Sequence, residues 1–567
     1  MFKKILLKTW MVWLLIAGLT VLIYSETVSF GMLNNYDDDA YFSDKRISEL
    51  TSANVKTYFS DYYLGMYQPL PVLSFAFVNS ISPGSMPAQR MVNILLHCIN
   101  ILLVLLIIKK LTGNLYIGAF TALFFAVHPM HVESVSWIST RSNLLYSSFY
   151  LGSVFAYIGL ENKQKALKWL FVFLCFALAL FSKVTAATLP AVLLLIDWYN
   201  GRKLKPAIWV PYIPLLLLSG IFVWIGIQAS SAFGHITDMG QSYTISERMV
   251  LLLHALWLYI SKFFLPVNQS VLYLFPFKEN GMLPLSYFIT AFLAMFTILM
   301  LVVAVIKFRR HESGKALLFG FFFFLITISI VMPLKWLRTV IVAERYTYLP
   351  YIGLTVGLLL LLWQFARHKG GNSKAILTSL LLLVALVFSV QTYQRNKVWE
   401  NPVTLFGDVI HKNIGRAETS MGYYNRGNEF FRIENAEKAI SDYSSAIGIY
   451  PAYREAFYNR GLTYYLTGNN EEAISDFTQT IGIKNDFADA YINRGAAYRN
   501  TGQYDLALSD LDQAIFLYPS ALAYLSRGVL YYSNFNNPEQ ACSDWNAAAQ
   551  MGSAQAKQLL DEYCNRQ

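Results

Sequence analysis

Acidic, basic and imidazole side chains occur in the short polar stretches that interrupt this otherwise apolar sequence. The first such stretch, NNYDDDAYFSD, places Asp37, Asp38 and Asp39 a few residues after an apolar segment. A carboxylate there is suited to act as a general base that takes a proton from an attacking hydroxyl group. Carboxylates near hydrocarbon are costly, so three in a row need an explanation. A solvated loop without catalytic function is the simpler alternative, because acidic residues have little influence on membrane topology.

Three basic residues in later polar stretches are candidates for binding a phosphate group. They are Arg141, Lys183 and Arg345. The planar guanidinium of arginine binds phosphate through two parallel hydrogen bonds, whereas lysine supplies a compact positive charge. Each residue also has a simpler interpretation. Arg141 and Lys183 could extend their charged ends to a headgroup boundary, and Arg345 could form only a local ion pair with Glu344.

Other polar residues of the same stretches are candidates for a pocket wall or for contacts with an acceptor. They are Gln68, His97, His128, His131, Glu133, Glu344 and Tyr346, with Tyr67 beside the first of them. In HPMHVE, two histidines and a glutamate have the side chains of zinc ligands. Pro129 disfavours a continuous helix there, however, and the spacing is not that of an HExxH motif. We therefore favour chemistry without a metal bound by this segment.

The elements that must position these residues are apolar helices. Of the 567 residues, 55% are hydrophobic and only 14% are charged, and the mean hydropathy is +0.39. This composition lies outside that of soluble domains. Over residues 1–394 it predicts an all-α, polytopic membrane bundle of about 11 spans. The segments of spanning length are 6–24, 88–108, 114–130, 141–160, 166–182, 184–199, 206–227, 284–306, 315–333, 348–366 and 374–393.

Basic residues between these segments predict the orientation of the bundle. Starting from Lys3, Lys4 and Lys8, clusters of Lys and Arg fall on every second connection, which the positive-inside rule assigns to the cytoplasm. The N-terminal segment is then an uncleaved signal anchor, because its apolar stretch is long and no A-x-A-like site follows. The outer loops with the candidate residues fall on the opposite side. The apolar run 250–266 preserves this alternation as an interfacial or re-entrant helix on the outer side.

The formal net charge of +10 does not indicate nucleic-acid binding. Lysine and arginine lie mainly in the short turns between apolar segments, where membrane topology explains them. The four cysteines, Cys98, Cys175, Cys542 and Cys564, show no CxxC motif and no metal-ligand spacing. From the sequence they support neither a disulfide nor a zinc site.

Sequence repeats begin after the last apolar segment. Arg-Gly pairs recur at Arg426, Arg460, Arg494 and Arg527, with spacings of 34, 34 and 33 residues. This is the period of a tetratricopeptide repeat, in which helix pairs stack into an α-solenoid with a concave face. We predict such a solenoid over residues 395–567. Tyrosines at the start of each first helix are expected in packing and asparagines in groove contacts; these residues are Tyr423, Asn425, Tyr458, Asn459, Tyr491 and Asn493.

Several segments together resemble one family. In chain order they are DDDAY, YQPLPVLSFAF, RMVNILLHCINILLVLLI, ALFFAVHPMHVESVSWISTRSNLLYSSFYL, LFSKVTAATLPAVLLLIDWY, ERYTYLPYIGL and VWENPVTLF, followed by the repeats. This order is similar to that of the transmembrane and tetratricopeptide-repeat-containing O-mannosyltransferases and their bacterial relatives. That family belongs to the GT-C glycosyltransferases, which take a sugar from a polyprenyl-phosphate or dolichyl-phosphate carrier on the lumenal or periplasmic side. Gln68 stands where many relatives have arginine, which argues against a phosphate contact at that position.

The resemblance implies roles for the candidate residues. GT-C enzymes carry an acidic motif in the first outer loop, and Asp37 and Asp38 resemble it, with Asp39 as the adjacent alternative. This carboxylate would take the proton of the acceptor hydroxyl during a single displacement that inverts the anomeric centre. Charge on the departing phosphate would be stabilised by Arg141, Lys183 and Arg345. No cofactor is expected to be required; the alternative is a divalent cation, Mg²⁺ or Mn²⁺, held by Asp37 and Asp39.

The resemblance also implies partners and a location. The donor would be a polyprenyl- or dolichyl-phosphate sugar, and the repeats would present a protein acceptor along their groove. Short loops and one N-terminal anchor favour a bacterial inner membrane with the site and the repeats in the periplasm; the eukaryotic equivalent is an ER membrane with lumenal repeats. A glycan or lipid acceptor, or a non-enzymatic membrane-anchored scaffold, are the alternatives. A scaffold would not need polar residues in so many outer loops, and a transporter would show ionisable groups near the midplane and an internal repeat of its spans.

Overall fold

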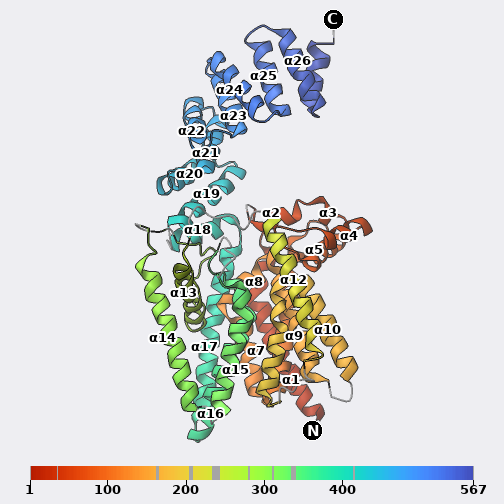
Figure 1. Ribbon diagram of the computed structural model, residues 1–567, viewed down its shortest axis with the longest axis vertical. Helices are drawn as coiled ribbons and strands as arrows, with labels where there is room; N and C mark the ends of the chain where they lie inside the picture. The colour runs from red at the N-terminus through yellow and green to blue at the C-terminus, as the bar shows by residue number, and fades with distance from the viewer. Residues whose placement is uncertain are drawn as a thin grey trace. The chain divides into compact units, whose positions relative to one another are not determined.

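The computed structural model describes residues 2–34, 36–160, 165–202, 209–232, 243–276, 278, 281–308, 312–333, 340–412 and 416–565. These residues form helices joined by short connections, with two isolated β-bridges among them. The chain divides into two units, Met1–Asp408 and Val409–Gln567 (Figure 1). The predicted all-α fold is confirmed. The expected boundary after residue 394 falls within α17 (Ser373–Asn396), whereas the division lies within α18 (Pro402–Lys412).

Each of the eleven apolar segments contains a helix. They are α1 (Phe2–Tyr24), α6 (Met86–Thr112), α7 (Leu115–Val127), α9 (Arg141–Gly159), α10 (Lys165–Ser182), α11 (Leu189–Tyr199), α12 (Tyr212–Ala232), α14 (Leu285–Phe308), α15 (Glu312–Ile328), α16 (Pro350–Lys369) and α17. In the described part of the chain, 7 helices are long and apolar enough to cross a membrane, or up to 8 if α7 and α8 form one bent span. The other expected spans, α9, α10 and α11, are shorter or more polar, so length and composition alone do not identify them as spans.

A bend after α7 creates the first polar interruption of the bundle. Pro129 starts a short turn, η2 (Pro129–His131), because proline fits the first position of a helix but cannot continue one. The following helix, α8 (Val132–Ser136), completes a segment bent by 58° relative to α7. Such a break leaves backbone polar groups that need partners inside a membrane protein. The HPMHVES segment therefore lies at a place where polar groups gather.

Three further interruptions carry most of the remaining candidates. They are η3 (Ile138–Thr140) before α9, η5 (Val184–Thr188) between α10 and α11, and η8 (Glu344–Thr347) before α16. Arg141 is the first residue of α9, and Lys183 has an extended backbone between α10 and η5. The candidate cations therefore lie at helix ends rather than within helices.

The acidic loop belongs to a small helical region between α1 and α6. Its helices are α2 (Asp37–Phe42), α3 (Lys45–Ser48), α4 (Ser52–Ser60) and α5 (Pro69–Ile81). Arg46 holds them together, because its guanidinium donates to the carboxylates of Asp44 and Asp61. Tyr41 of α2, Phe75 of α5 and Ile138 of η3 share one apolar cluster. This packing fixes α2 against η3.

The apolar run 250–266 forms α13 (Ile245–Phe264), which is not among the helices that are long and apolar enough to cross a membrane. It begins with a capping box formed by Thr244 and Glu247. Lys262, in the last turn of α13, donates from Nζ to the carbonyl oxygens of Val267 and Asn268 beyond the helix, at 2.7 and 2.9 Å. The interfacial or re-entrant position of this helix stays a prediction.

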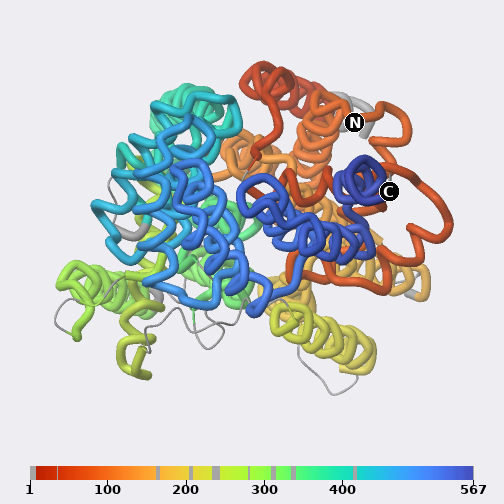
Figure 2. The backbone as a smooth tube through the Cα atoms, turned by 90° about the horizontal axis from the view of Figure 1, so that it is seen from above, coloured from red at the N-terminus to blue at the C-terminus, as the bar shows by residue number. Residues whose placement is uncertain are grey.

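The second unit consists of helix pairs in sequence. The pairs are α19 (Arg416–Arg432) with α20 (Ala436–Ile449), α21 (Arg454–Leu466) with α22 (Asn470–Ile483), α23 (Ala488–Asn500) with α24 (Tyr504–Leu517) and α25 (Ala521–Ser533) with α26 (Pro538–Gln550), followed by α27 (Ala554–Tyr563). Figure 2 shows the pairs winding one after another. The predicted solenoid of tetratricopeptide repeats is confirmed.

The Arg-Gly motif has a structural explanation within each repeat. Its arginine donates two hydrogen bonds of 2.7 to 2.9 Å to an aspartate on the second helix of the same repeat. The pairs are Arg426–Asp442, Arg460–Asp476, Arg494–Asp510 and Arg527–Asp544. A Cβ atom on Gly528 would lie 2.6 Å from the Trp545 ring, so glycine permits the close approach of α25 and α26. The motif therefore holds the two helices of a repeat together.

Two of the repeated asparagines connect neighbouring repeats. Asn459 donates to the side-chain oxygen of Asn428 at 2.8 Å, and Asn493 donates to the hydroxyl of Tyr458 at 2.8 Å. Their amide donors therefore serve the array itself. The expected contacts of these asparagines with a ligand in the groove stay a prediction.

A disulfide closes the C-terminal end of the array. Cys542 on α26 is bonded to Cys564 after α27, with the two Cα atoms 5.9 Å apart. Cysteine spacing in the sequence did not predict this disulfide. The fold explains it, because α26 and α27 are antiparallel and bring together two residues 22 positions apart. Cys98 and Cys175 are free thiols in the first unit.

Candidate functional site

The three aspartates of the acidic loop differ in burial. Asp38 is fully buried, whereas Asp37 and Asp39 are partly exposed. The Asp38 carboxylate accepts hydrogen bonds from the backbone N–H groups of Leu33 and Ser139, each at 3.2 Å, and from the Ser139 hydroxyl. Burial raises the pKa of Asp38, and the hydrogen bond from Ser139 opposes this shift. Asp38 therefore fastens the acidic loop to η3, while Asp37 and Asp39 keep access to solvent.

The two histidines of the HPMHVES segment are buried and bonded to backbone groups. His128 donates from Nε2 to the carbonyl of Phe263 at 3.2 Å, and its Nδ1 accepts from the N–H of Met130 at 3.2 Å. His131 donates from Nδ1 to the carbonyl of Phe125 at 2.9 Å. Both nitrogens of His128 thus have partners within the bundle. Across the residues that the structure describes, no group of three or more His, Cys, Asp or Glu side chains is arranged to hold a metal ion.

Glu133 and Arg345 join two segments that are distant in the sequence. Glu133 Oε2 accepts the backbone N–H of Arg345 at 2.7 Å, and Oε1 pairs with the Arg345 guanidinium. The Glu133 side chain is 1% exposed, whereas that of Arg345 is 20% exposed. The glutamate therefore anchors the arginine from the buried side and leaves part of the cation accessible.

Asn143 of α9 connects Lys183 to Arg345. Lys183 Nζ donates to Asn143 Oδ1, and Asn143 Nδ2 donates to the Arg345 carbonyl at 3.1 Å. The Tyr346 ring lies 5.1 Å from the guanidinium carbon of Arg345 and 5.7 Å from Lys183 Nζ. Two cations thus flank one tyrosine ring. Because both cations can donate to anionic oxygens, this arrangement is suited to a phosphate group.

Trp137 joins the acidic loop to this pair of cations. Its ring lies 4.6 Å from that of Tyr36, the residue before Asp37, and 5.5 Å from the guanidinium carbon of Arg345. Trp399 stacks against the same indole at 5.7 Å. The structure therefore brings the acidic loop, η3 and η8 to one place, although the three segments span more than 300 residues of sequence.

Arg141 makes its contacts in a different part of the bundle. Its guanidinium is fully buried, donating to Asn93 Oδ1 at 2.9 Å and to the Gln89 carbonyl at 2.6 Å, and it stacks over Phe75 at 4.4 Å. These contacts tie α9 to α5 and α6 rather than to Lys183 or Arg345. The phosphate-binding role expected for Arg141 stays a prediction.

Gln68 and His97 are also buried in contacts of their own. Gln68 Nε2 donates to the Tyr41 hydroxyl. His97 donates from Nε2 to the carbonyl of Ala126 at 3.3 Å, and its Nδ1 accepts from the Tyr348 hydroxyl at 2.7 Å. The first contact holds α5 against α2, and the second pair links α6 to α7 and to the turn between η8 and α16. A role of either side chain in the pocket stays a prediction.

Glu344 lies beside Arg345 in the sequence but has different partners. Its carboxylate, 1% exposed, accepts from the Tyr273 hydroxyl at 3.1 Å and from Gln269 Nε2 at 3.4 Å. Burial raises the pKa of Glu344 to about 7, and the positive charge of Arg395 opposes the shift. The simpler alternative, a local ion pair between Glu344 and Arg345, is not what the structure shows: Glu344 pairs with Arg395, and Arg345 pairs with Glu133.

Several residues of this region were not among the sequence candidates. Arg90 donates to the carbonyls of Phe30, Gly31 and Ser136, and so ties α6 to the start of the acidic loop and to the end of α8. Asn143, Trp137 and Arg395 were likewise not selected. Arg90 carried a usable signal, because a charged residue within an apolar helix is expensive and needs buried partners. Asn143 and Trp137 had no such signal in the sequence, apart from their position near Arg141.

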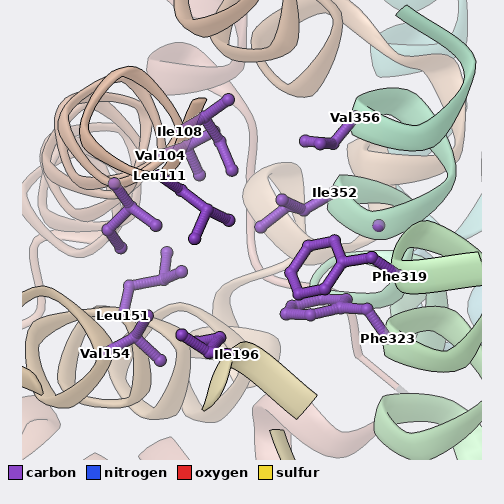
Figure 3. Close-up of a pocket in the computed structure, with 12 residues that line it drawn as sticks. Val104, Ile108, Leu111, Leu151, Val154, Ile196, Phe319, Phe323, Ile352 and Val356 are labelled. Atoms are coloured by element: carbon purple, nitrogen blue, oxygen red, sulfur yellow. The ribbon is translucent and has the colours of Figure 1, made fainter. Parts of the chain in front are cut away.

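Two cavities in the bundle are apolar and differ in size. The smaller, of about 20 Å³, has room for about one water molecule and is drawn in Figure 3. Its wall includes Val104, Leu151, Phe319 and Val356. The larger, of about 300 Å³, lies between α13, α14, α15 and α16. Neither is lined by an ionisable residue, so the polar cluster around Trp137 is separate from both.

Comparison with known proteins supports the resemblance seen in the sequence. Residues 68–225 match the family described as dolichyl-phosphate-mannose-protein mannosyltransferase. Residues 424–486 and 488–520 match tetratricopeptide repeat families. The first match includes the candidate residues from Gln68 to Lys183, and the other two lie within the second unit.

Curated relatives match most of this chain. Protein O-mannosyl-transferase TMTC3 of Homo sapiens is 24% identical over 485 residues, which cover 77% of this chain and 51% of the relative. TMTC1 of Homo sapiens is 25% identical over 462 residues, covering 69% and 48%. Protein O-mannosyl-transferase F38B6.6 of Caenorhabditis elegans is 25% identical over 408 residues, covering 69% and 54%. The chain spans about half the length of these relatives. Its resemblance to the transmembrane and tetratricopeptide-repeat-containing O-mannosyltransferases is confirmed.

Solved structures also match part of this chain. The crystal structure of MamA covers 27% of this chain and 89% of its own, with 20% identity and a TM-score of 0.25. The second TPR domain of human RPAP3, in complex with an HSP70 peptide, covers 20% and 98%, with 27% identity and a TM-score of 0.20. At these TM-scores the matches carry no argument about ligands of this chain.

Proposed function

We propose that this chain is a GT-C membrane glycosyltransferase that moves a sugar, mannose or similar, from a polyprenyl-phosphate carrier to an acceptor hydroxyl. The acceptor is Ser or Thr of a protein. One observation carries the proposal: Tyr36 of the acidic loop and Arg345 contact the same Trp137 indole. This contact supports a carboxylate base and a phosphate site within one region, which neither a scaffold nor a simple anchor requires.

Arg345 and Lys183 bind the phosphate of the donor. Glu133 fixes the Arg345 guanidinium through its buried edge, and Asn143 fixes Lys183, so both cations are oriented before the donor arrives. Preorganised cations stabilise negative charge that develops on a leaving group without a cost of reorganisation during the reaction. The two residues therefore stabilise the departing lipid phosphate.

Asp37 acts as the base, with Asp39 as the adjacent alternative. Both are partly exposed, whereas Asp38 already accepts three hydrogen bonds. The acceptor oxygen attacks the anomeric carbon, the bond from that carbon to the phosphate oxygen breaks, and its electron pair leaves with the phosphate. The hydroxyl proton moves to the carboxylate. One displacement inverts the anomeric centre. We expect no metal requirement; Mg²⁺ or Mn²⁺ at Asp37 and Asp39 is the alternative.

Apolar surfaces of the bundle accommodate the lipid part of the donor. The cavity of about 300 Å³ has walls from α13 to α16, including Phe263, and the Phe263 carbonyl accepts the hydrogen bond from His128. An isoprenoid chain gains free energy in proportion to the apolar area that it buries. This cavity therefore offers a place for part of that chain.

The repeats recruit the acceptor protein on the extracytoplasmic side. Disulfides persist in oxidising compartments and are rare in the cytosol. The Cys542–Cys564 bond therefore supports a bacterial periplasm, or an ER lumen, as the compartment of the second unit. The basic connections between the apolar helices favour the same orientation.

Sugar transfer by the purified, full-length chain tests the proposal. The protein in nanodiscs receives radiolabelled polyprenyl-phosphate mannose together with a Ser/Thr-rich peptide, a glycan or a lipid acceptor. We expect labelled peptide with an inverted anomeric configuration, and a loss of about 10² to 10⁴ in turnover for Asp37→Asn. Glu49→Gln, which changes an exposed carboxylate that follows α3, is the matched control and keeps the parental rate.

The other outcomes of this assay would change the acceptor class, the metal requirement or the enzyme assignment. Labelled glycan or lipid without labelled peptide would change the acceptor class and keep the chemistry. Turnover that depends on added Mg²⁺ or Mn²⁺, and that EDTA abolishes, would favour the metal alternative. Absence of product with all three acceptors would refute the enzyme and favour a membrane-anchored scaffold.

A further inference from the structure

A buried bridge of three charged residues links η8 to α18. Arg395, in the last turn of α17, has a side chain that is only 5% exposed. Its Nη1 donates to Asp408 Oδ2 on α18 at 2.6 Å, and its Nη2 lies 3.6 Å from Glu344 Oε1 on η8. The side chain of Asp408 is 13% exposed. We call these three residues the Asp408–Arg395–Glu344 bridge.

Glu344 is also tied to the connection that follows α13. Tyr273 and Gln269 of this connection donate to its carboxylate. The backbone supports the same contact, because the N–H of Ile341 donates to the carbonyl of Tyr273 at 2.8 Å. The ERYT turn is therefore held through Glu344 on one side and through the Glu133–Arg345 pair on the other.

The composition of the bridge argues against a purely stabilising role. Taking charges out of water is expensive, and apolar residues of similar volume often stabilise a fold as well or better. What the ionic bridge supplies is direction, because the hydrogen bond to Asp408 fixes one end of the Arg395 guanidinium and the charge of Glu344 attracts the other end. Glu344 and Arg345 are consecutive residues of one 3₁₀ turn, so a displacement of Glu344 displaces the Arg345 backbone as well.

We infer that Arg395 is a positioning residue of the donor site, which fixes the ERYT turn through Glu344 and Asp408 and thereby sets the direction of the Arg345 guanidinium. The inference rests on the proposed function, because it assigns the donor phosphate to Arg345. Arg395 itself does not bind the donor. It couples the helix that precedes the repeats in the sequence to the cation that receives the phosphate.

Protonation of Glu344 changes the strength of the bridge. The charged groups that face Glu344 are Arg395 of α17, Glu133 of α8 and Lys262 of α13, together with the phenol of Tyr273. Burial raises the pKa of Glu344 to about 7, so the carboxylate is ionised above pH 7 and becomes neutral as the pH falls below it. Only the ionised form attracts Arg395. The bridge, and donor binding with it, therefore strengthens from pH 6 to pH 8.

The experiment measures donor binding rather than turnover. Full-length protein in nanodiscs is titrated with short-chain polyprenyl-phosphate mannose, a phosphodiester whose own charge is constant between pH 6 and pH 8. The variants are Arg395→Met, Arg395→Lys, Asp408→Asn and Glu344→Gln. Lys397→Gln is the matched control, because Lys397 lies two residues from Arg395 and its exposed side chain contacts Glu26 at 3.9 Å and the Tyr393 ring, not Glu344 or Asp408. Size exclusion and thermal unfolding identify any variant that fails to fold.

We expect Arg395→Met to raise the donor Kd about tenfold, which corresponds to about 1.4 kcal/mol. Arg395→Lys restores the charge without the fork and falls between Arg395→Met and the parent. The parent binds about threefold more tightly at pH 8 than at pH 6, a coupling of ordinary size for a residue outside the ligand contact. Glu344→Gln removes this pH dependence, and Lys397→Gln behaves as the parent.

The outcomes separate the inference from the proposed function. Equal Kd values for the parent and for folded Arg395→Met and Asp408→Asn would reduce the bridge to a structural ion pair and overturn the inference. If the parent binds the donor but transfers no sugar, the proposed function fails while the Kd comparison still decides the inference. A parent that does not bind the donor overturns both.

Discussion

The hydrogen bonds of Asp38 predict that Asp38→Asn loosens the acidic loop while the adjacent base stays in place. Asp38 Oδ1 accepts from the N–H and the hydroxyl of Ser139, and Oδ2 accepts from the N–H of Leu33. Asparagine has one acceptor oxygen and one amide donor. Whichever way its amide is turned, an NH₂ group then faces an N–H donor in a buried site.

The expected cost follows from this mismatch. A buried donor without an acceptor costs about 1 to 3 kcal/mol. Removing the buried negative charge offsets part of the cost, because burial already raises the pKa of Asp38 and so disfavours the carboxylate. We expect a net loss of about 2 kcal/mol in the local stability of the loop, which corresponds to about 30-fold more frequent opening.

Hydrogen exchange of the full-length chain in nanodiscs measures this opening directly. The amides of Leu33 and Ser139 report the two ends of the contact, and exchange by local opening follows the local free energy. Glu49→Gln is the matched control, because Glu49 is an exposed carboxylate of the same helical region between α1 and α6. Unchanged exchange at both amides in Asp38→Asn, combined with the loss of sugar transfer expected of Asp37→Asn, would refute this reasoning and make Asp38 the base.

Three further predictions concern the second unit, each measured on the full-length chain. Arg460→Ala removes two hydrogen bonds to Asp476, whose side chain is 5% exposed. It should destabilise α21 and α22 by about 2 kcal/mol, measured by hydrogen exchange. Unchanged exchange would contradict the role of the arginine in holding the two helices together. Gly528→Ala drives a Cβ into Trp545 and should cost about 1 to 3 kcal/mol. The control Gly482→Ala has open space around its Cβ and should stabilise α22 slightly. Cys542→Ser should lower the stability of α27 by about 3 kcal/mol. In the parent, Cys542 and Cys564 should react with maleimide only after reduction. Labelling without reductant would contradict both the disulfide and the proposed compartment.

Periodicity and hydropathy predicted the elements of the fold better than the contacts between them. The 34-residue spacing identified every repeat, and the eleven apolar segments each contain a helix. The partner of the repeated arginine was also present in the sequence, because Asp442, Asp476 and Asp510 each follow an arginine of the motif by 16 residues. The disulfide left no comparable signal. Its cysteines become neighbours only once α26 and α27 pack against each other.

The sequence indicated candidate polar residues but not which of them lie together. Asn143 contacts Lys183 and Arg345, whereas Arg141, only two residues earlier on α9, contacts α5 and α6. Two residues correspond to a rotation of about 200° around a helix. Which of the two faces the other cations therefore depends on how α9 is rotated in the bundle. Packing sets this rotation, and a single sequence does not encode it locally.

Burial divides the polar residues of the first unit into a framework and a reactive surface. Arg90, Arg141 and Asp38 are each at most 1% exposed and form their hydrogen bonds with backbone, amide or hydroxyl groups of neighbouring segments. A donor or base in such a position would have to break these bonds before it met a substrate. Asp37 and Arg345 keep access to solvent while their neighbours hold their backbone in place. This is the arrangement that preorganised chemistry needs, because a reacting group gains from being held by residues that do not themselves react.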